Sequence, residues 1–394
     1  MKILHAIQSA DPAGGGPIEG ILQLASATRS SCEHVVVSLD RPDAEFLSKL
    51  PVTVHALGPA GFLGYSSRLL PWLRRHRASY RIVMVHGLWR YVSFGCWRAL
   101  RDGNVPYVVF PHGMLDPWFK HRYPLKHLKK LAFWPWTEYR LLRDARAVIF
   151  TCEEEKLRAR KSFGLYRANE EVAVLGIGHP PMDVEAQRKA FCDSFPHLAD
   201  KRVLLFLSRI HPKKGCDLLV EAFARTAALD ERVHLVVAGP DATGWGATLR
   251  RDAENAGIAH RITWTGMLTG AVKWGAYRCA DAFILPTHHE NFGIVVAEAL
   301  ACGLPVLISD KVQIWREIIG HDAGCAESDT LQGTERLIRR WLEFSPAEWN
   351  AMRAHARACY TSEFDVDRYA DRILALVELY APERAPALNL APQA

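Results

Sequence analysis

Two glutamates in the carboxy-terminal half of the chain, Glu290 and Glu298, stand eight positions apart. The apolar run that ends at Leu285 predicts a buried strand, and the apolar stretch after Gly293 predicts a helix that Gly303 and Pro305 bring to an end. The first carboxylate therefore lies in a loop beyond a strand, where open α/β sheets bind ligands. The second lies on the helix, where it can accept hydrogen bonds from two neighbouring hydroxyls, such as those of a ribose.

A basic segment, Ser208-Arg209-Ile210-His211-Pro212-Lys213-Lys214-Gly215, follows another predicted strand. Arg209 and Lys214 place two cations at the end of that strand, where they can neutralise a diphosphate as it becomes a leaving group. The amides near Gly293 and Ile294 begin a helix and also attract phosphate. Taken alone, each of these pairs also fits an ordinary solvated surface. The prediction of a ligand site depends on their occurrence together.

Two shorter signals lie in the amino-terminal half. Phe110-Pro111-His112-Gly113 ends a predicted strand and offers an imidazole, which is also compatible with a buried structural histidine. Gly14-Gly15-Gly16 follows the first strand and allows close backbone approach to a ligand, although a glycine loop is also an ordinary turn.

The elements that must position these residues alternate between apolar runs and segments of helical periodicity. Because several runs are continuously apolar, we expect parallel strands covered on both faces, arranged as two doubly wound α/β domains. We predict a first domain over residues 1–178, a second domain over 179–363 and a final helix at about 364–382. The expected strands are Ile3–Gln8, His34–Leu39, Val52–Leu57, Ile82–His86, Tyr107–Phe110, Ala147–Thr151, Val203–Ser208, Val233–Ala238, Ile262–Thr265, Ala282–Leu285 and Pro305–Ile308.

Composition narrows the class of protein. The 394 residues suit two domains, and no window is apolar enough for a membrane-spanning helix. The nine cysteines are scattered and odd in number, which favours buried thiols in a reducing compartment and a cytoplasmic location. Residues 1–180 carry 25 Lys+Arg against 15 Asp+Glu, a balance of +10, which leaves −4 for the rest of the total of +6. The basic half suggests an anionic partner, or only an arginine-rich surface.

The most basic segment, residues 117–146, interleaves lysines and arginines with aromatic residues. This composition suits an anionic membrane surface or a lipid-diphosphate acceptor, and the alternative is a structural aromatic core with a solvated basic face. Nucleic-acid binding is the least favoured interpretation. The residues expected on this surface are Trp118, Lys126, Lys129, Lys130 and Trp134.

Two further patterns resemble metal sites but are better explained otherwise. Asp365-Val366-Asp367 opens the last predicted helix, where acidic residues cap amides and favour the helix dipole. His288-His289 are adjacent, so their side chains point apart, and we expect a loop or a pocket wall. We therefore predict no metal and no cofactor.

Taken together, Glu290, Glu298, Arg209 and Lys214 resemble the retaining GT-B glycosyltransferases of family GT4, over nearly the whole second domain. The resemblance implies two Rossmann-like domains facing across a cleft and a last helix that crosses back onto the first. It also implies that Glu290 lies against the donor sugar, Glu298 binds the nucleoside, the two cations hold the diphosphate and His112 contacts the sugar. The other implied donor contacts are Gly15, Gly16, Asn291, Phe292, Gly293 and Ile294.

Two segments depart from the family pattern: the linker Leu175–Pro181 and the loop Ser309–Glu317. The resemblance nevertheless implies metal-independent transfer of a sugar from a UDP- or GDP-sugar to a glycan or lipid-linked acceptor, in surface polysaccharide assembly such as that of lipopolysaccharide, by a protein that is peripheral on the inner membrane face. Two alternatives remain open, a nucleotide-sugar 2-epimerase of the same architecture and a non-catalytic nucleotide-sugar-binding scaffold.

Overall fold

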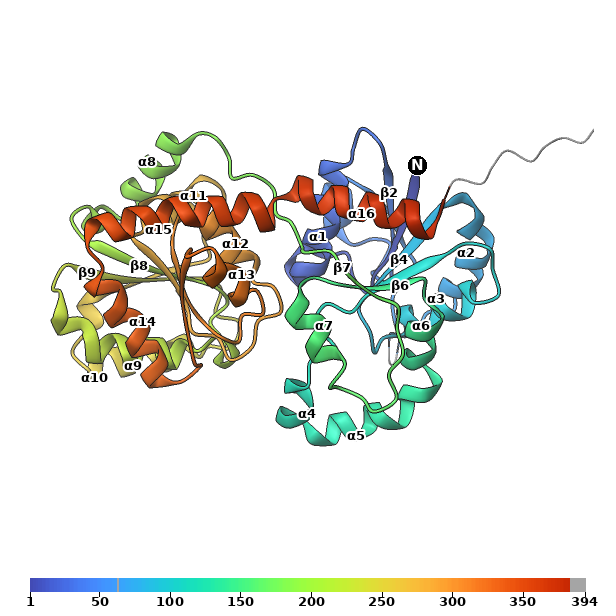
Figure 1. Ribbon diagram of the computed structural model, residues 1–394, viewed down its shortest axis with the longest axis horizontal. Coiled ribbons are helices and arrows are strands. Elements are labelled where there is room, and N and C mark those ends of the chain that lie inside the picture. The colour runs from blue at the N-terminus through green and yellow to red at the C-terminus, as the bar shows by residue number, and fades with distance from the viewer. Residues whose placement is uncertain (62–63, 383–394) are drawn as a thin grey trace, which may run out of the picture. The chain divides into compact units, whose positions relative to one another are not determined.

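A computed structural model describes residues 1–61 and 64–382 (Figure 1). The chain divides into two compact units of similar size. Unit 1 comprises Met1–Gly176 together with the chain from Val366 onward, and unit 2 comprises Ile177–Asp365. The chain therefore leaves unit 1 once and returns to it once.

Among the described residues, unit 1 is built on a seven-stranded parallel sheet in the order β3-β2-β1-β4-β5-β6-β7. Every neighbouring pair of strands is parallel, as the continuous apolar runs predicted. The strands are β1 (Lys2–Ala6), β2 (Glu33–Ser38), β3 (Thr53–Ala56), β4 (Ile82–His86), β5 (Tyr107–Phe110), β6 (Ala147–Phe150) and β7 (Glu170–Val172). The helices are α1 (Gly16–Ala27), α2 (Leu69–His76), α3 (Tyr91–Leu100), α4 (Trp118–Arg122), α5 (Pro124–Phe133), α6 (Glu138–Asp144), α7 (Glu153–Ala159) and α16 (Val366–Tyr380).

Unit 2 repeats the plan, with a six-stranded parallel sheet over its described residues in the order β10-β9-β8-β11-β12-β13. Its strands are β8 (Arg202–Leu207), β9 (Val233–Ala238), β10 (Ile262–Gly266), β11 (Ala282–Leu285), β12 (Val306–Ser309) and β13 (Gly324–Glu327). Its helices are α8 (Val184–Ser194), α9 (Cys216–Thr226), α10 (Gly246–Asn255), α11 (Gly270–Cys279), α12 (Ile294–Ala301), α13 (Trp315–Gly320), α14 (Leu331–Glu343) and α15 (Pro346–Cys359), which a π-helical turn at Tyr360–Phe364 follows.

The predicted fold class, two Rossmann-like α/β domains, is confirmed. Two edge strands, β7 and β13, were not predicted, because Glu170-Glu171-Val172 and Gly324-Cys325-Ala326-Glu327 lack the apolar run of a central strand. Tight packing explains one glycine in β13: a Cβ on Gly324 would lie 2.1 Å from the Val306 carbonyl oxygen of the neighbouring strand.

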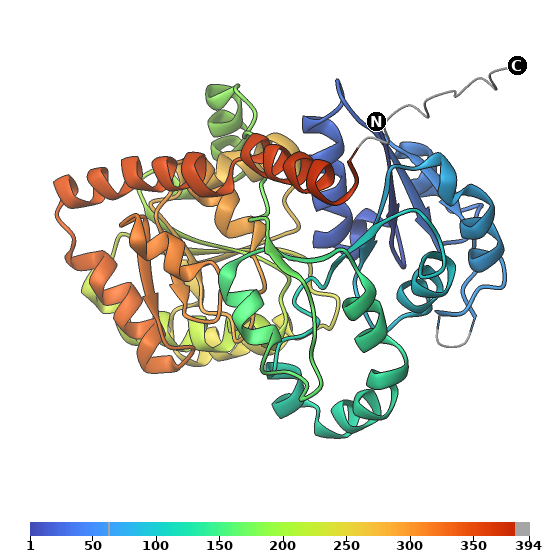
Figure 2. The same ribbon diagram turned by 45° about the vertical axis from the view of Figure 1, so that its right-hand side comes forward.

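The last helix, α16, packs on α1 of unit 1, as the prediction of a helix that crosses back requires (Figures 1 and 2). Polar contacts fasten its far end. Arg81 Nε donates to the Ala381 carbonyl at 2.6 Å, and the Arg81 guanidinium pairs with Glu378 at 2.6 Å. Arg372 pairs with Glu171 at 2.8 Å, so α16 also holds the edge strand β7.

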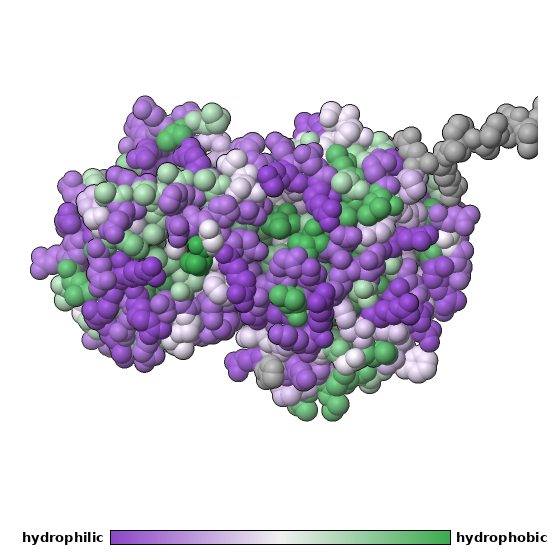
Figure 3. Space-filling view, in the orientation of Figure 1, coloured by the Kyte–Doolittle hydropathy of each residue, from purple (hydrophilic) through white to green (hydrophobic). Residues whose placement is uncertain are grey.

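One region of unit 1 exposes apolar side chains to solvent. Figure 3 shows hydrophobic residues gathered where α5 lies in Figure 1. On α5, Leu125 is 83% exposed and Leu128 65% exposed, and Trp136 just beyond it is 64% exposed. No helix in the described part of the chain combines the length and the apolar character needed to cross a membrane.

Candidate functional site

The carboxyl ends of β8 and β11 lie side by side in unit 2, because these strands are neighbours at the point where the strand order reverses. Arg209 and Lys214 follow β8, and Glu290 follows β11. The structure thus brings the predicted basic segment and the predicted loop carboxylate to the position where doubly wound sheets bind their ligands.

Lys214 and Glu290 form an ion pair between these two strand ends. Both side chains are largely buried. Gly215, the residue after Lys214, has a φ of +68° and lies so close to the Pro286 carbonyl that a Cβ would not fit. Burial by itself would raise the pKa of Glu290, but the charge and hydrogen bond of Lys214 outweigh it and the pKa lies below its usual value of 4.5. Glu290 is therefore ionised at neutral pH.

Two hydrogen bonds join the backbone of Glu290 to the loop Ser309–Glu317, whose sequence departs from the family pattern. Glu290 donates its amide to the Lys311 carbonyl at 3.0 Å, and Gln313 donates its amide to the Glu290 carbonyl at 3.1 Å. The departure therefore changes the residues of this loop but leaves it in contact with the predicted site.

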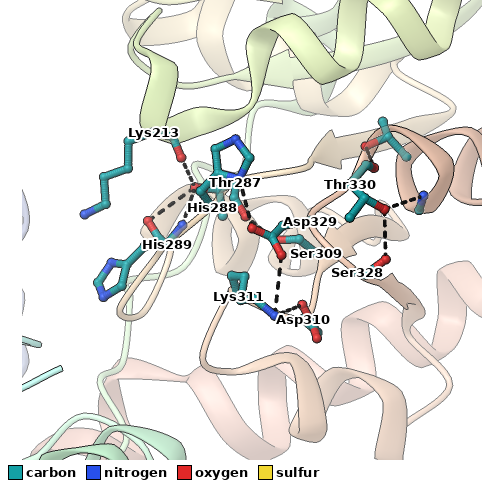
Figure 4. A network of polar contacts seen from close by, with 12 residues as sticks. Lys213, Thr287, His288, His289, Ser309, Asp310, Lys311, Ser328, Asp329 and Thr330 are labelled. Carbon is teal, nitrogen blue, oxygen red and sulfur yellow. Dashed lines mark hydrogen bonds and ion pairs between the residues drawn. The ribbon is translucent and has the colours of Figure 1, made fainter. Parts of the chain in front are cut away.

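A polar network fastens the surrounding loops to one another (Figure 4). The Lys213 carbonyl accepts hydrogen bonds from Thr287 Oγ1 at 2.8 Å and from the His288 amide at 2.9 Å. The His288 ring lies 2.9 Å from Asp329, which also faces Lys311 at 3.5 Å. His288 is thus part of the loop framework, and its neighbour His289 is buried.

Glu298 lies on the second turn of α12, as predicted, and is buried. Its Oε1 accepts a hydrogen bond from Lys273 Nζ at 2.6 Å, and its Oε2 accepts one from the Tyr277 hydroxyl at 2.9 Å. Burial, together with the charge of Glu298, raises the pKa of Tyr277 well above its usual value, so the phenol stays protonated and donates. Sequence reasoning missed Lys273 and Tyr277, although their spacing of four residues on α11 places them on one helix face.

The residues between the two glutamates set the start of α12. Gly293 caps the helix with φ at +84°, a conformation that favours glycine, and Ile294 is the first helical residue. Phe292 is buried and packs edge-on against Phe364 at 5.7 Å, so it holds the loop in place. Arg209 differs from its neighbours: its side chain is exposed, and no hydrogen bond or ion pair joins it to another described residue.

Unit 1 places the glycine loop at the start of α1. Gly15 precedes the helix with φ at +92°, and Gly16 is its first residue. Gly14, Gly15 and Gly16 are exposed, and a Cβ on Gly14 or Gly15 would meet no atom within 4 Å. Backbone geometry at Gly15, and open space beside it, leave the amide end of α1 accessible to a ligand.

His112 follows β5 and has φ at +51°, which is uncommon for a side-chain-bearing residue. Its loop is fixed by Glu155 of α7, which accepts hydrogen bonds from the Gly113 amide at 2.6 Å and from the Thr151 amide at 2.7 Å. His112 Nε2 lies 3.0 Å from His86 Nδ1. Burial lowers the pKa of His112 to about 4, so the imidazole is neutral. Glu155 and His86 were not singled out in the sequence, because nothing in their local pattern links them to His112.

The expected basic aromatic surface is realised only in part. Lys126 and Lys129 are exposed on α5, and Trp118 is half-buried. Lys130 stacks on Trp89 with Nζ 4.4 Å from the ring centroid, and burial lowers its pKa. Trp134 is a correction: it is 2% exposed and stacks on Phe163 at 4.1 Å, so it belongs to the core of unit 1 and not to the surface. The aromatic periodicity of the segment does not separate core from surface.

Two family models match successive parts of the chain. The model for glycosyl transferases group 1 matches residues 188–358, and the model for the glycosyl transferase 4-like domain matches residues 15–178. Among curated proteins, D-inositol 3-phosphate glycosyltransferase of Mycolicibacterium smegmatis is 30% identical over 203 residues, which are 48% of this chain and 45% of that protein. The chain spans between 26% and 55% of the length of the curated relatives it matches.

Solved structures share the fold at lower identity. Anabaena Alr3699/HepE, solved in complex with UDP and glucose, superposes with a TM-score of 0.75 at 20% identity, over 96% of this chain and all of that one. WaaG, a glycosyltransferase involved in lipopolysaccharide biosynthesis, superposes with a TM-score of 0.68 at 16% identity, over 97% of this chain and all of that one. With the sheet order of both units and the two successive family matches, the protein belongs to the glycosyl transferases group 1, with a glycosyl transferase 4-like domain at its amino-terminal side.

Proposed function

We propose that the protein is a retaining glycosyltransferase that uses a nucleotide diphosphate sugar as donor. The observation that carries this proposal is the grouping of Lys214, Glu290 and Arg209 beyond the adjacent strands β8 and β11, with Glu298 held on the helix that follows. Family membership supports the reaction class, and the UDP and glucose bound to Alr3699/HepE make UDP-glucose the first donor to test.

Arg209 and Lys214 bind the diphosphate in this proposal. A lysine ammonium has three N–H donors, and only one is needed for Glu290, so Lys214 keeps two for phosphate oxygens without giving up its ion pair. Arg209 is exposed and offers a planar guanidinium that suits phosphate. The two cations stabilise the leaving diphosphate, so the proposal requires no metal.

Glu298 binds the ribose. Each carboxylate oxygen has about two lone-pair sites, and Lys273 and Tyr277 occupy one on each oxygen. One site on each oxygen is left for the two neighbouring hydroxyls of the sugar. The lysine and the tyrosine therefore orient the carboxylate before the ligand arrives, which limits the entropy lost on binding.

The chemistry breaks the bond between the anomeric carbon and the diphosphate oxygen, and it forms a bond from that carbon to the acceptor oxygen. The acceptor proton passes to the departing diphosphate, which leaves on the same face, so configuration is retained. Glu290 lies against the donor sugar in this scheme, and the family resemblance adds contacts from His112, Gly15 and Gly16.

We further propose a lipid-linked or glycan acceptor and a peripheral position on an anionic membrane. The support is the exposed surface of α5, where Leu125 and Leu128 alternate with Lys126 and Lys129. Apolar side chains flanked by lysines suit the headgroup region of an anionic bilayer. A role in surface polysaccharide assembly follows from this acceptor class.

A thermal-shift panel with UDP-sugars, GDP-sugars, UDP, GDP and NAD tests the proposal. A ligand at about one hundred times its dissociation constant adds roughly 2.7 kcal/mol, which is measurable. A shift with one nucleotide-sugar that Glu298→Ala abolishes supports the site and names the base. Product stereochemistry, read by NMR with a lipid-linked acceptor, then separates transfer from the alternatives. Turnover of the nucleotide-sugar without acceptor would indicate an epimerase, and binding without turnover would indicate a scaffold.

A further inference from the structure

Four histidines of unit 1 form a continuous hydrogen-bonded row that ends at His112. His112 Nε2 lies 3.0 Å from His86 Nδ1, and His86 Nε2 lies 3.0 Å from His5 Nδ1. His5 Nε2 in turn lies 2.8 Å from His34 Nδ1. At the far end, His34 Nε2 lies 2.7 Å from Thr28 Oγ1. Each inner ring uses both of its nitrogens, so the row has no branch.

The row follows from the register of the sheet. His34 lies on β2, His5 on β1 and His86 on β4, and His112 is the second residue after β5. These four strands are neighbours in the sheet in that order. His34 is registered with Ile3, His5 with Met84 and His86 with Phe110. Each step therefore moves one strand across and two residues along, which keeps all four side chains on one face.

The Thr28 hydroxyl sets the direction of the hydrogen bonds. It donates its single proton to the Leu24 carbonyl at 2.7 Å, because a carbonyl can only accept. Thr28 Oγ1 must then accept from His34, which carries its proton on Nε2. A neutral imidazole has one donor and one acceptor nitrogen. His5, His86 and His112 must therefore each donate through Nε2 to Nδ1 of the ring before them in the row.

All four rings are buried or nearly so, and burial keeps them neutral. Burial lowers the pKa of His5 and His86 well below the usual 6.5 and lowers that of His34 to about 4. No carboxylate in the described residues is hydrogen-bonded to any of the four rings. A proton added to the row would remove one acceptor and break the sequence of bonds.

We propose that Thr28, His34, His5 and His86 act as positioning residues that fix His112 as the neutral Nε2–H tautomer, which leaves the lone pair of Nδ1 as a hydrogen-bond acceptor. Nδ1 forms no hydrogen bond to another described residue, so it is available to a ligand. A neutral acceptor binds a hydroxyl, and it offers neither charge nor proton to a carboxylate. The preference for a substrate rests on the function proposed above. His112 then favours a donor sugar that places a hydroxyl against Nδ1 over the corresponding uronic acid, which places a carboxylate there.

The tautomer is measured directly by histidine-selective ¹⁵N NMR of the full chain at neutral pH, with the His112 signal assigned through His112→Asn. The expected spectrum shows a protonated Nε2 and a bare Nδ1. A protonated Nδ1, or an imidazolium, in the wild-type chain would overturn the proposal, and no substrate is required.

Thr28→Val and Thr28→Ser form a matched pair that tests control from a distance. Serine keeps the hydroxyl and the preference for the Nε2–H tautomer, whereas valine removes the acceptor of His34 and leaves the two directions of the row similar in energy. We expect His112 in Thr28→Val to become a mixture of tautomers, and an unchanged signal would refute control through the row. If the valine variant does not fold, His34→Gln is measured in the same way.

Activity supplies a second and separable readout. In Thr28→Val, kcat/KM for a donor bearing the hydroxyl should fall about tenfold, which corresponds to one hydrogen bond, while the uronic acid changes little. The serine variant should match the wild type. If the wild type transfers no sugar from any donor, the proposed function fails, while the NMR result still decides the tautomer.

Discussion

Lys214 and Glu290 face each other from the ends of β8 and β11, with side chains only 10% and 20% exposed. Because the two side chains are so close, the charge of each one is balanced by the other. Loss of the lysine leaves a poorly solvated carboxylate, and loss of the carboxylate leaves a lysine whose charge is balanced only by a bound anion. Substitutions at the two positions should therefore have opposite effects on the binding of an anionic ligand.

Lys214→Met should lower kcat/KM by about 10²–10³, because one cation that stabilises the leaving diphosphate is lost, roughly 2–4 kcal/mol. Steady-state kinetics with the donor identified by thermal shift provide the measurement. Lys201→Met, which removes an exposed lysine of the same unit, is the control and should leave kcat/KM near the wild-type value. Near-normal turnover in Lys214→Met would remove the diphosphate assignment.

Glu290→Gln should bind the nucleoside diphosphate at least as tightly as the wild type does. The substitution removes the negative charge that competes for Lys214, while transfer falls because the carboxylate against the donor sugar is gone. Calorimetric titration with UDP or GDP measures the first effect, and turnover measures the second. Weaker binding of the diphosphate would argue against an ion pair that competes with phosphate.

Tyr277→Phe should weaken nucleotide binding by about 1 kcal/mol, since one hydrogen bond that orients Glu298 is lost. The contact is present in both the ground state and the transition state, so we expect KM to rise while kcat changes little. Tyr369→Phe on α16 is a matched control, because it removes a buried tyrosine hydroxyl that forms no hydrogen bond to another described residue. A fall in kcat alone would place Tyr277 nearer to the reacting atoms than proposed.

Acid should destabilise unit 1 through its histidine row. His34 and His112 have pKa values of about 4 in the folded chain, against the usual 6.5. The unfolded chain therefore takes up protons first as pH falls, and the stability that is complete above pH 6.5 is lost progressively toward pH 4. The melting temperature of the wild type should fall more steeply with decreasing pH across this range than that of His34→Phe. His355→Phe, at an exposed position of α15, should keep the wild-type slope.

Charge reversal on α5 tests the membrane proposal. The double variant Lys126→Glu, Lys129→Glu should reduce binding to vesicles that contain anionic lipid, by about 1 kcal/mol for each lysine near the surface. Cosedimentation provides the measurement. Lys189→Glu, Lys201→Glu makes the same change of charge in unit 2 and should bind as the wild type does. Equal binding by all three proteins would leave α5 as a structural surface.

The sequence was sufficient for the features that depend on local pattern. Continuous apolar runs predicted the central strands, and the turn chemistry around Gly293 and Gly303 predicted the helix that carries Glu298. The family resemblance supplied the fold and the final helix. Trp134 was misplaced because aromatic residues that alternate with basic ones look alike whether they pack on Phe163 or face solvent.

The sequence could not predict the residues that only the packing of distant elements brings together. Lys273 and Tyr277 reach Glu298 because α11 lies beside α12, and Glu155 reaches the His112 loop because α7 follows β6. The histidine row requires the order and register of four strands, which no local window contains.

The course of the chain also affects how the protein is made. Unit 1 contains the first 176 residues, but α16, which packs on α1 and holds β7 through Arg372, is synthesised after all of unit 2. On the ribosome, unit 2 can complete its sheet while unit 1 still lacks its last helix. During that interval the surface of α1 that α16 covers stays exposed, so nascent chains arrested before residue 366 should engage chaperones more than full-length chains do.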